Sequence, residues 1–432
     1  MKYPVSSDRF KFVSSDSREC DAQTAFVVDW YSRKFLDDAV KNGAAAVLQA
    51  GDLGEYFDVN MPIVGISGTN GKTTIAALIY SFLLDLGYSV AMQGTRGFFI
   101  DGRSLAPKLL TTPVLLENYA RIDCAKKRGC DFFITEISSH AIAQGRAEGL
   151  KFALKVHSNI TGDHLDFHRL FEEYRRVKNS FFADETPKII NKDDPQIEFN
   201  FANARTYAIE AAAAFKLEAY SQNDGLSGAV VFSGERAIFN SNLIGRFNLY
   251  NILAAIGAVK TLTDKPLQTI CDLVENFGGV AGRMEIVSQK PLVIVDFAHT
   301  QDGIEKVLEA LLPRKIVAVF GAGGDRDKSK RAPMGAEAAK RCVKIYLTSD
   351  NPRSEDPLKI IEEIRIGCGS HPNVFCIADR KEAIAKALEN LASDEILVIL
   401  GKGDETTQTI GETVLPFSDR EIVLELLKGG AA

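Results

Sequence analysis

The sequence predicts an α/β protein of three domains, and three observations lead to this fold class. From residue 61 onward, short apolar runs alternate with helical patterns, as in parallel sheets covered by helices. A chain of 432 residues corresponds to roughly three domains at about 150 residues each. The composition, 46% hydrophobic and 25% charged, is that of a globular protein large enough to bury several cores.

The strand candidates are short apolar runs separated by helical patterns. The first, MPIVGIS (61–67), is followed by a glycine-rich loop and by the helical pattern KTTIAALIYSFLLDLG (72–87), which ends at Gly87. The apolar positions of this helix share one face: Ile75, Leu78, Ile79, Phe82, Leu83 and Leu86. The later strand candidates are 132–135, 153–158, 188–191, 291–298, 315–321, 344–350, 373–379 and 395–401.

Two positions suggest domain boundaries. The first lies at 58–61, just before the strand that leads into the glycine-rich loop. The second is the glycine-rich segment FGGVAGRM (277–284), which we interpret as a hinge. The expected domains are therefore 1–60, 61–281 and 282–432.

Charge and cysteine content exclude several classes of protein. A formal net charge of −6 lacks the basic footprint of sequence-independent nucleic-acid binding, so we expect no nucleic-acid partner. The seven cysteines show no CxxC or Cys/His finger spacing, which favours buried free thiols in a reducing compartment. The start of the chain has no apolar signal region, and no stretch of 18 apolar residues occurs. We therefore expect a cytoplasmic protein without membrane insertion.

The strongest local signal is the segment GISGTNGKTT (65–74), which lies between a strand and a helix. Glycines let the backbone curl around a phosphate, and the amides at the helix start point into the concavity. Lys72 would reach the β- and γ-phosphates, and the Thr73 hydroxyl would contact Mg²⁺. The strict GxxxxGK[ST] pattern has glycine where this chain has Ile66, so an ordinary glycine-rich turn is the alternative. The residues expected to bind ATP here are Gly68, Thr69, Asn70, Gly71, Lys72, Thr73 and Thr74.

This loop, together with EISSH (136–140) and TGDHLDFH (161–168), resembles the Mur ligase family, whose members add amino acids to the peptide of the cell-wall precursor. The resemblance continues in family order through later segments: GRFNLYNILAA (245–255), AGRMEIV (281–287), VDFAHTQDGIEKVL (295–308), GAGGDRDKSKR (321–331) and SDNPRSEDP (349–357). The DNPR element resembles the type that adds meso-2,6-diaminopimelate.

The resemblance implies a three-domain architecture and a reaction. A small N-terminal UDP-binding domain, a central P-loop parallel-sheet ATPase domain and a C-terminal Rossmann-like, amino-acid-binding domain would follow one another. The activity implied is ATP-dependent amide ligation in peptidoglycan precursor synthesis. Meso-2,6-diaminopimelate would join UDP-N-acetylmuramoyl-L-alanyl-D-glutamate through an acyl phosphate, and we expect a monomer. Such chemistry requires positioning and charge stabilisation of phosphoryl groups.

Four residues are expected at the phosphoryl-transfer site: Lys72, Glu136, His164 and Lys178. Glu136 and His164 follow strand candidates and could ligate Mg²⁺ together with Thr73, although imidazole suits this hard cation less well. By resemblance, Lys178 in EEYRRVKNSFF (172–182) matches a lysine carbamylated by carbon dioxide to N6-carboxylysine, a ligand for a second Mg²⁺. Taken alone, Glu136 is a surface acid, His164 a polar residue at a helix entry, and Lys178 part of a solvated basic helix face.

Further nucleotide contacts are implied by resemblance. Asn248 and Asn251 lie in a helix start that the family uses around adenine and ribose, although capping alone could explain Asn248. Arg283 and Asp296, with His299 nearby, resemble groups that clamp ATP when the last domain closes, as in other enzymes with closing domains.

The nucleotide-sugar peptide has its own expected residues. By resemblance, Ser17 and Arg18 in SSDSREC (14–20) hold the uridine diphosphate. The positions that match residues holding the muramoyl-dipeptide are Thr111, Thr112, Ser138, Gln144 and Arg146. Arg146 offers a planar fork to a carboxylate or phosphate, while a turn before a helix also explains TTP.

The incoming amino acid carries an ammonium and a carboxylate at each end. Selecting it over lysine requires a cation for the distal carboxylate, for which Arg353 and Arg326 are candidates, and an acid for the distal ammonium, for which Glu405 is the candidate. The complete expected set is Arg326, Asp350, Asn351, Pro352, Arg353, Gly401 and Glu405. Position 404 is Asp, where the family usually has His. A solvated charged loop is the alternative interpretation of GGDRDKSKR.

Two other functions compete with this one. A folylpolyglutamate synthase would share the phosphate loop and the carbamylated lysine, but this alternative does not explain the DNPR segment (350–353). A P-loop ATPase switch would hydrolyse ATP without an acceptor. A catalytically dead binding protein is disfavoured because Lys72, Glu136, His164 and Lys178 are all present.

Overall fold

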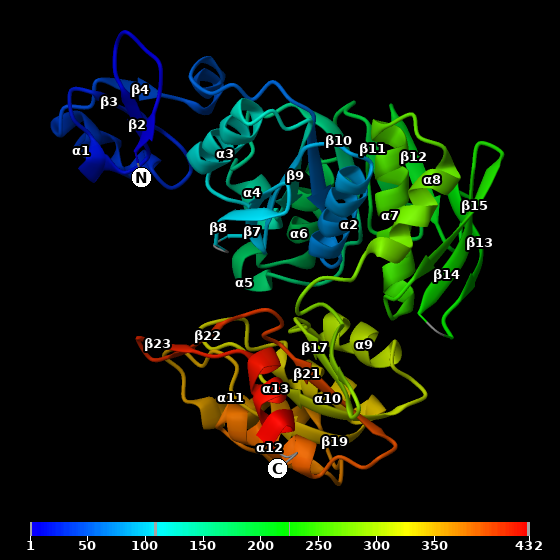
Figure 1. The fold of residues 1–432 in the computed structure, drawn as a ribbon. Helices are drawn as coiled ribbons and strands as arrows, with labels where there is room; N and C mark the ends of the chain where they lie inside the picture. The colour runs from blue at the N-terminus through cyan, green and yellow to red at the C-terminus, as the bar shows by residue number, and fades with distance from the viewer. Residues whose placement is uncertain (1, 108–109, 224, 430–432) are drawn as a thin grey trace.

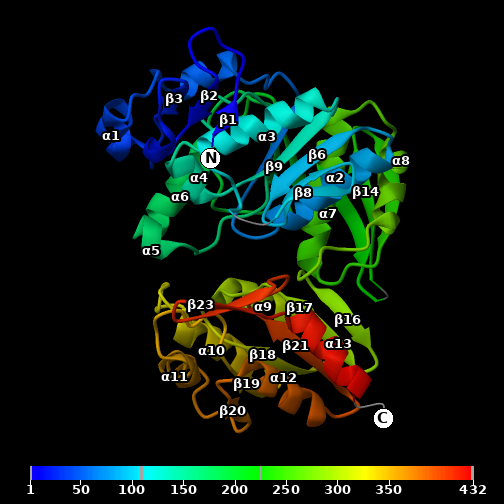
Figure 2. The same ribbon diagram turned by 60° about the vertical axis from the view of Figure 1, so that its left-hand side comes forward.

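The computed structural model describes residues 2–107, 110–223 and 225–429. Within these ranges lie sheets of four, eleven and six strands, in chain order, and a two-stranded hairpin. Figures 1 and 2 place the four-stranded sheet beside helix α3 of the eleven-stranded sheet. The six-stranded sheet and its helices lie below the eleven-stranded one in both views. We propose domain boundaries after residues 60 and 281, because the sheets change there. Residues 1, 108–109, 224 and 430–432 of these domains lie outside the described part.

The N-terminal sheet has the order β1-β2-β3-β4, with β1 antiparallel to β2 and the other pairs parallel. Its apolar side chains, among them Val13 and Val27, share a core with Leu115 and Tyr119 of α3 (Leu115–Lys127). A segment of this size buries little surface by itself, so the neighbouring helix completes its core. The elements are β1 (Tyr3–Pro4), β2 (Phe12–Ser14), η1 (Ser17–Glu19), β3 (Thr24–Val27), η2 (Arg33–Phe35), α1 (Leu36–Lys41), β4 (Ala46–Leu48) and η3 (Ala50–Glu55).

The central sheet has the order β15-β14-β13-β12-β11-β10-β5-β9-β6-β7-β8. The strands from β13 to β6 run parallel, as the alternation predicts, although β6, β12 and β13 are not among the strand candidates. β14–β15 and β7–β8 add antiparallel hairpins at the two edges. These edge strands are partly exposed and carry weaker apolar patterns than buried parallel strands. The strands are β5 (Ile63–Ser67), β6 (Val90–Gly94), β7 (Gly97–Ile100), β8 (Arg103–Ala106), β9 (Phe132–Ile137), β10 (Phe152–His157), β11 (Lys188–Asn191), β12 (Ala204–Ala208), β13 (Phe215–Ser221), β14 (Leu226–Phe232) and β15 (Glu235–Ser241).

Helices cover both faces of the central sheet. Val64 and Ile66 of β5 face a core formed with α2, α7 and α8, while Ile63 faces the opposite core with α3. The predicted helix 72–87 is confirmed as α2; it ends at Asp85, and Gly87 has a φ of +86°. Its predicted apolar face is buried except for Leu86, which is half-buried. The other helical segments are α4 (Ser139–Ala143), α5 (Leu165–His168), α6 (Phe171–Ser180), α7 (Arg246–Leu262), α8 (Leu267–Asp272) and η4 (Leu273–Asn276), besides α2 (Lys72–Asp85).

The C-terminal sheet has the order β16-β17-β21-β18-β19-β20, parallel except for β16. Helices α9, α10 and α11 cover one face, and α12 and α13 cover the other. All five strands predicted here form. The elements are β16 (Glu285–Gln289), β17 (Leu292–Asp296), α9 (Gln301–Glu309), β18 (Lys315–Phe320), α10 (Arg331–Arg341), β19 (Cys342–Leu347), α11 (Pro357–Gly367), β20 (Val374–Cys376), α12 (Arg380–Glu389), β21 (Glu395–Leu400), β22 (Thr407–Ile410), β23 (Thr413–Pro416) and α13 (Asp419–Gly429).

The thiols and the hydropathy of the helices bear on two expectations. The cysteines are free, as expected, and five are buried, whereas Cys124 is half-buried and Cys376 is exposed on the edge strand β20. Nothing among the helices of the described ranges is long and apolar enough to cross a membrane.

Candidate functional site

The glycine-rich loop connects β5 to α2, the order that the sequence predicted. Ile66, the departure from the strict pattern, is a buried residue within β5, and the loop proper begins at Gly68. Gly71 has a φ of +85° and packs so closely on the Asn251 amide that a Cβ would clash with it. The amides of the first turn of α2 lack intrahelical acceptors, and the helix dipole makes this end positive. The segment therefore has the backbone geometry and the positive helix end that suit an anion.

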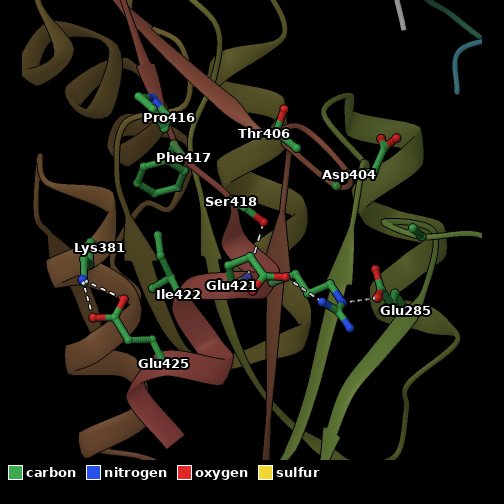
Figure 3. Close-up of a pocket in the computed structure, with 13 residues that line it drawn as sticks. Glu285, Lys381, Asp404, Thr406, Pro416, Phe417, Ser418, Glu421, Ile422 and Glu425 are labelled. Atoms are coloured by element: carbon green, nitrogen blue, oxygen red, sulfur yellow. Dashed lines mark hydrogen bonds and ion pairs between the residues drawn. The ribbon is translucent and has the colours of Figure 1, made fainter. Parts of the chain in front are cut away.

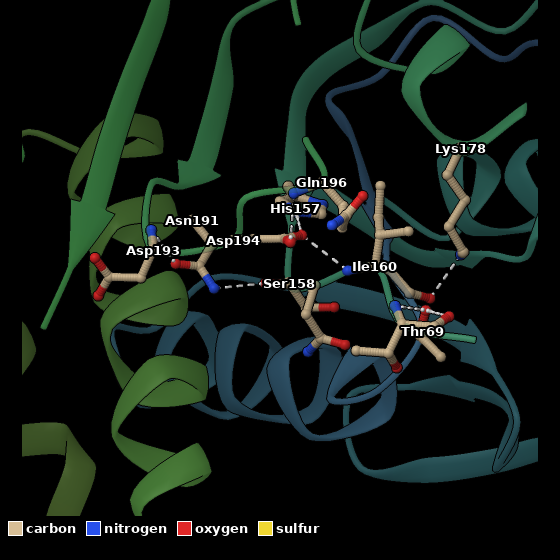
Figure 4. Close-up of polar contacts among 12 residues, drawn as sticks. Thr69, His157, Ser158, Ile160, Lys178, Asn191, Asp193, Asp194 and Gln196 are labelled. Atoms are coloured by element: carbon tan, nitrogen blue, oxygen red, sulfur yellow. Dashed lines mark hydrogen bonds and ion pairs between the residues drawn. The ribbon is translucent and has the colours of Figure 1, made fainter. Parts of the chain in front are cut away.

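The tip of this loop is held by the segment that follows β10 (Figure 4). The Thr69 amide donates to the Asn159 carbonyl at 2.6 Å, and the Asn70 amide donates to Asn159 Oδ1 at 3.1 Å. The Ser158 hydroxyl donates to the Asn70 carbonyl at 2.6 Å. Because the protein itself engages these two amides, the main-chain donors that face a phosphate begin at Gly71.

A buried pair beneath this segment supports it in turn. His157 Nε2 lies 2.8 Å from Asp194 Oδ2, and the same oxygen accepts from the Ile160 amide at 2.8 Å. Asn191 donates to the Ser158 carbonyl at 2.8 Å, as Figure 4 shows. Burial lowers the pKa of His157, so this ring is neutral at pH 7. Sequence reasoning missed these residues, which have no motif of their own.

Two lysines meet the first carbonyl of the loop. Lys72 Nζ donates to the carbonyls of Gly68 and Thr69, both at 2.8 Å, and Lys178 Nζ donates to Gly68 at 2.7 Å. Lys178 is 2% exposed, so the solvated-face interpretation is wrong. Burial first, and the charge of Lys72 second, hold the pKa of Lys178 well below its usual value. This environment favours the neutral amine of Lys178, which lies beside the glycine-rich loop.

Glu136 lies at the end of β9, 2% exposed, which excludes the surface-acid interpretation. Its Oε2 accepts from the Thr73 hydroxyl at 2.9 Å, and its Oε1 accepts from the Thr95 amide at 2.8 Å. The Thr112 hydroxyl donates to the Glu136 carbonyl at 2.8 Å. A carboxylate and a hydroxyl oxygen thus lie together at the start of α2, and both are ligands that Mg²⁺ prefers.

His164 has a left-handed backbone, with φ +55°, and its Nε2 lies 3.3 Å from Asp163 Oδ2. Its ring lies 4.7 Å from that of His140, and burial lowers the pKa of His164 to about 4. Burial would raise the pKa of Asp163, but surrounding positive charges, that of Lys72 among them, leave it lowered. Asp163 was missed as a site residue although it stands in the motif.

No three His, Cys, Asp or Glu side chains in the described ranges gather in a way that could hold a metal. A metal ion at this sheet edge would be bound by oxygens of Thr73 and Glu136 and by phosphate oxygens of a bound nucleotide. The structure brings these two residues together, whereas it places His164 beside Asp163 and His140.

The predicted adenine and ATP-clamping residues occupy both sides of the domain junction. Asn251 donates to Asn248 Oδ1 at 2.8 Å, and Asn248 donates to the Ile244 carbonyl at 2.8 Å, which fixes the start of α7. Arg283 lies 4.2 Å over the Phe297 ring. Asp296 is buried at the end of β17, where burial raises its pKa.

A direct contact joins the glycine-rich loop to the C-terminal domain. Asn70 Nδ2 donates to Asp302 Oδ2 at 2.7 Å, and the Thr161 hydroxyl donates to the same oxygen at 3.1 Å. Lys306 pairs with Asp302 at 2.9 Å. Asp302 lies in the first turn of α9. The C-terminal domain therefore touches the loop that would hold the nucleotide.

The residues expected to hold the sugar-peptide lie where the first two domains meet. Arg146 donates to Gln144 Oε1, to the Thr112 carbonyl at 2.9 Å, and to the Tyr31 hydroxyl at 3.1 Å. Its fork thus links the N-terminal domain to the central one. The Ser138 amide donates to the Thr112 hydroxyl at 2.9 Å.

Three further residues expected to hold the nucleotide-sugar peptide differ in how exposed they are. The Thr111 hydroxyl lies 3.1 Å from that of Thr95, near Glu136. Ser17 is buried in η1, whereas the Arg18 side chain is 87% exposed and pairs with Asp16.

The residues expected to bind the amino acid follow the carboxyl ends of β18, β19 and β21, where open parallel sheets bind ligands. Asn351 donates to Asp350 and to Glu405, both at 3.0 Å. The close approach of Asp350 explains Gly401, since a Cβ there would lie 2.7 Å from Asp350 Oδ2. The structure therefore brings this part of the predicted set together.

The two candidate arginines lie beside the same glycine. A Cβ on Gly323 would meet Arg353 Nη1 at 3.0 Å and Arg326 Cγ at 3.6 Å. Arg353 has a φ of +50° and donates to the Gly324 carbonyl at 2.7 Å, while Pro352 packs on Gly324.

Lys402 is the cation of this cluster that sequence reasoning missed, although it stands in the GKGDE segment. It is fully buried and donates to Glu405 at 2.8 Å. The acid expected to meet the distal ammonium therefore already has a cationic partner. Asn351 also lies 3.3 Å from the Lys402 ammonium.

A cavity of about 610 Å³ is lined by Asp404, Phe417 and the start of α13 (Figure 3). Lys381 pairs with Glu425, and Arg420 pairs with Glu285 and Glu421. Because these charged groups neutralise one another, we do not assign the cavity to a substrate. Asp404 belongs to this cavity wall.

Comparisons with known proteins show the family to which the chain belongs. Two family profiles match, described as "Mur ligase middle domain" over residues 66–259 and "Mur ligase, glutamate ligase domain" over 282–403. A protein named UDP-N-acetylmuramoyl-L-alanyl-D-glutamate--2,6-diaminopimelate ligase from Wolinella succinogenes is 52% identical, over 99% of this chain and 98% of that relative. A protein of the same name from Helicobacter pylori is also 52% identical, over 88% of this chain and 86% of the relative.

Solved structures show the same fold. One titled as a UDP-N-acetylmuramoyl-L-alanyl-D-glutamate--2,6-diaminopimelate ligase aligns with a TM-score of 0.66 at 30% identity, over 97% of this chain and 95% of that one. A Mycobacterium tuberculosis folylpolyglutamate synthase aligns with a TM-score of 0.67 at 16% identity, over 82% of this chain and 91% of that one, which shows a shared fold. With two matching family profiles and full-length relatives at this identity, the chain belongs to the Mur ligase family.

Proposed function

We propose that this chain is the ATP-dependent ligase that joins meso-2,6-diaminopimelate to the D-glutamyl carboxylate of UDP-N-acetylmuramoyl-L-alanyl-D-glutamate. The observation that carries the proposal is the pairing of two sites. An anion site with the buried Lys178 and the half-buried Lys72 lies at a sheet edge of the central domain, and a charged cluster suited to an amino acid lies at a sheet edge of the C-terminal domain. Asn70 contacts Asp302 between those domains. Relatives that are 52% identical bear the corresponding name.

The first step transfers a phosphoryl group. The glutamyl carboxylate oxygen attacks the γ-phosphorus of ATP, and the bond from that phosphorus to the β-phosphate oxygen breaks. ADP departs as the leaving group, and the glutamyl carboxylate becomes an acyl phosphate. We assign the amides from Gly71 to Thr74 and the Lys72 ammonium to the β- and γ-phosphates. Fixed donors and cations stabilise the charge that spreads over the transferring group.

The second step forms the amide. The amine of diaminopimelate attacks the acyl carbon, loses a proton, and inorganic phosphate departs with the electron pair of the acyl–oxygen bond. Arg353 and Arg326 would hold the distal carboxylate. Glu405, fixed by Lys402 and Asn351, would face the distal ammonium. Precise positioning accounts for a large share of the rate in such reactions.

The donor set fits a divalent cation. Thr73 and Glu136 place two hard oxygens together, so they would hold Mg²⁺, which would neutralise phosphate charge. We propose that a second Mg²⁺ is held with His164 and a carbamate on Lys178. The lowered pKa of Lys178 supports the carbamate, because a neutral amine is the form that reacts with carbon dioxide.

The remaining assignments are proposals of the same kind. Ser17 and Arg18 would contact the uridine diphosphate, and Thr111, Thr112, Ser138, Gln144 and Arg146 would line the path of the muramoyl-dipeptide. Asn248, Asn251, Arg283 and Asp296 would surround the adenosine. We place the protein in the cytoplasm as a monomer.

The test is a product assay. The protein is incubated with ATP, Mg²⁺, the UDP-muramoyl dipeptide and one amino acid at a time, and the product is weighed by mass spectrometry. We expect a product with diaminopimelate, and phosphate release that requires both the sugar-peptide and the amino acid. Phosphate release without either would indicate an ATPase switch. In a parallel incubation with a folate acceptor in place of the sugar-peptide, addition of glutamate to that acceptor would indicate a folylpolyglutamate synthase. Either result would overturn the proposal.

A further inference from the structure

Arg380 is a fully buried charge in the C-terminal domain for which the reaction described above has no use. It begins α12, and its side chain and that of Asp419, the first residue of α13, are both 0% exposed. Nε and Nη2 donate to the two Asp419 oxygens, each at 2.8 Å. A charge pair removed from water in this way costs desolvation energy and is weak evidence for stability, so its presence calls for a second reason.

The remaining donors of Arg380 reach two strand ends. Nη2 donates to the Leu400 carbonyl at 2.8 Å, and Nη1 donates to the Ser349 carbonyl at 3.3 Å. These carbonyls belong to the residues just before Gly401 and Asp350. Strands β19 and β21 do not pair, because β18 lies between them. One guanidinium therefore joins two loops of the amino-acid cluster across the intervening strand.

The charge of Arg380 also acts on that cluster. Burial alone would lower the pKa of Arg380, but Asp419 first, and then Asp350 and Glu405, raise it. Arg380 is thus coupled to the cluster by its hydrogen bonds and by its field.

We propose that Arg380, held by Asp419, is a positioning residue for the amino-acid substrate. It sets the separation of the loop that carries Asp350 and Asn351 from the loop that carries Glu405, and this separation determines which length of amino acid fits. The inference rests on the proposed function and extends it to substrate selection.

The experiment compares four variants with the wild-type protein: Arg380→Met, Arg380→Lys, Asp419→Asn and the double variant Arg380→Met/Asp419→Leu. Lys344→Met is the matched control, because Lys344 bridges β19 to Glu395 of β21 at 2.8 Å, at the opposite end of the strands. For each protein, kcat, the KM values for diaminopimelate and ATP, and the thermal midpoint are measured.

We expect Arg380→Met and Arg380→Lys to raise the KM for diaminopimelate by about tenfold to a hundredfold, a range consistent with misplacement of a binding group by about 1 Å. The KM for ATP should change less than about twofold, within the spread of mutations remote from a site. Asp419→Asn keeps the shape of the pair and should give a smaller rise. Lys344→Met should lower the thermal midpoint without raising the KM for diaminopimelate.

The double variant separates positioning from stability. Replacing a buried ion pair by apolar side chains is often neutral or stabilising, so we expect its thermal midpoint to recover while the KM for diaminopimelate stays high. The inference is overturned if the KM for diaminopimelate returns to the wild-type value in the double variant together with the thermal midpoint. It is also overturned if this KM does not rise in the Arg380 variants. Neither result affects the proposed function. A wild-type protein that releases no phosphate with diaminopimelate overturns the proposed function itself.

Discussion

The phosphate loop and the amino-acid cluster lie at equivalent sheet edges but balance their charges differently. At the loop, Lys72 and Lys178 donate to the carbonyl of Gly68, beside helix amides that an α-helix leaves open. In the cluster, Lys402 neutralises Glu405, and Asn351 bonds both Asp350 and Glu405. The phosphate loop therefore needs bound anions and a metal ion to balance its charges, whereas the side chains of the amino-acid cluster already balance one another without substrate.

The largest expected effect comes from a substitution at the phosphate loop. Lys178→Ala should lower ligation by about 10²–10³-fold or more, the loss typical of removing a group that stabilises transition-state charge. Added bicarbonate should not restore it, because the amine that accepts carbon dioxide is gone. Phosphate release is measured, and native mass spectrometry should show one carbon dioxide on the wild-type protein.

Lys155→Met provides the control for Lys178, since Lys155 is also buried in the central domain but donates to Phe181 and Asp184. It should lose stability and keep its ligase activity. Near-normal activity in Lys178→Ala would remove Lys178 from the mechanism.

The second prediction concerns Arg353 in the amino-acid cluster. Arg353→Lys should lower kcat/KM for diaminopimelate by about a hundredfold, because lysine cannot reproduce a forked contact with a carboxylate. The left-handed backbone at position 353 is no more strained with lysine than with arginine, so stability should change little. Arg365→Lys, at an exposed ion pair on α11, is the control. A wild-type preference for L-lysine over diaminopimelate would contradict the assignment.

A smaller effect concerns the support of the phosphate loop. The pKa of His157 is lowered in the folded protein from the ordinary 6.5, so below pH 6.5 the unfolded state binds more protons than the folded one. The free energy of unfolding should therefore fall as the pH drops through 6.5. His157→Gln, which can still donate to Asp194, should show a shallower fall in urea unfolding experiments. Equal slopes in the two proteins would mean that His157 does not carry the pH dependence.

The smallest expected effect concerns Asp404, where the family usually has His. Glu405 is held by Lys402 and Asn351, and these two contacts remain in the variant, so Asp404→His should change the KM for diaminopimelate by no more than about twofold. Titration of the amino acid in the ligation assay checks this. A change above about tenfold would show that residue 404 helps to set the geometry of Glu405.

The sequence by itself was sufficient for the elements with local causes. The glycine-rich loop requires left-handed glycine at 71, α2 repeats its apolar residues with helical spacing, and the buried parallel strands are continuous apolar runs. Motif residues such as Glu136, at the end of strand β9, and Asp350, after β19, lie at the carboxyl ends of parallel strands, the edge at which such sheets bind ligands. The antiparallel edge strands of the central sheet, with weak periodicity, escaped prediction, as did the parallel strands β6, β12 and β13.

Burial and partnership were decided by the tertiary structure, because they depend on segments far apart in the chain. Lys178 looks like a solvated lysine between charged neighbours, yet it donates to Gly68, which is 110 positions away. The Asn159 clamp on the loop, Lys402 beneath Glu405, and Arg380 across two strand ends likewise arise from folding. A side chain's charge state follows from the dielectric and the partners around it, and these exist once the chain has packed.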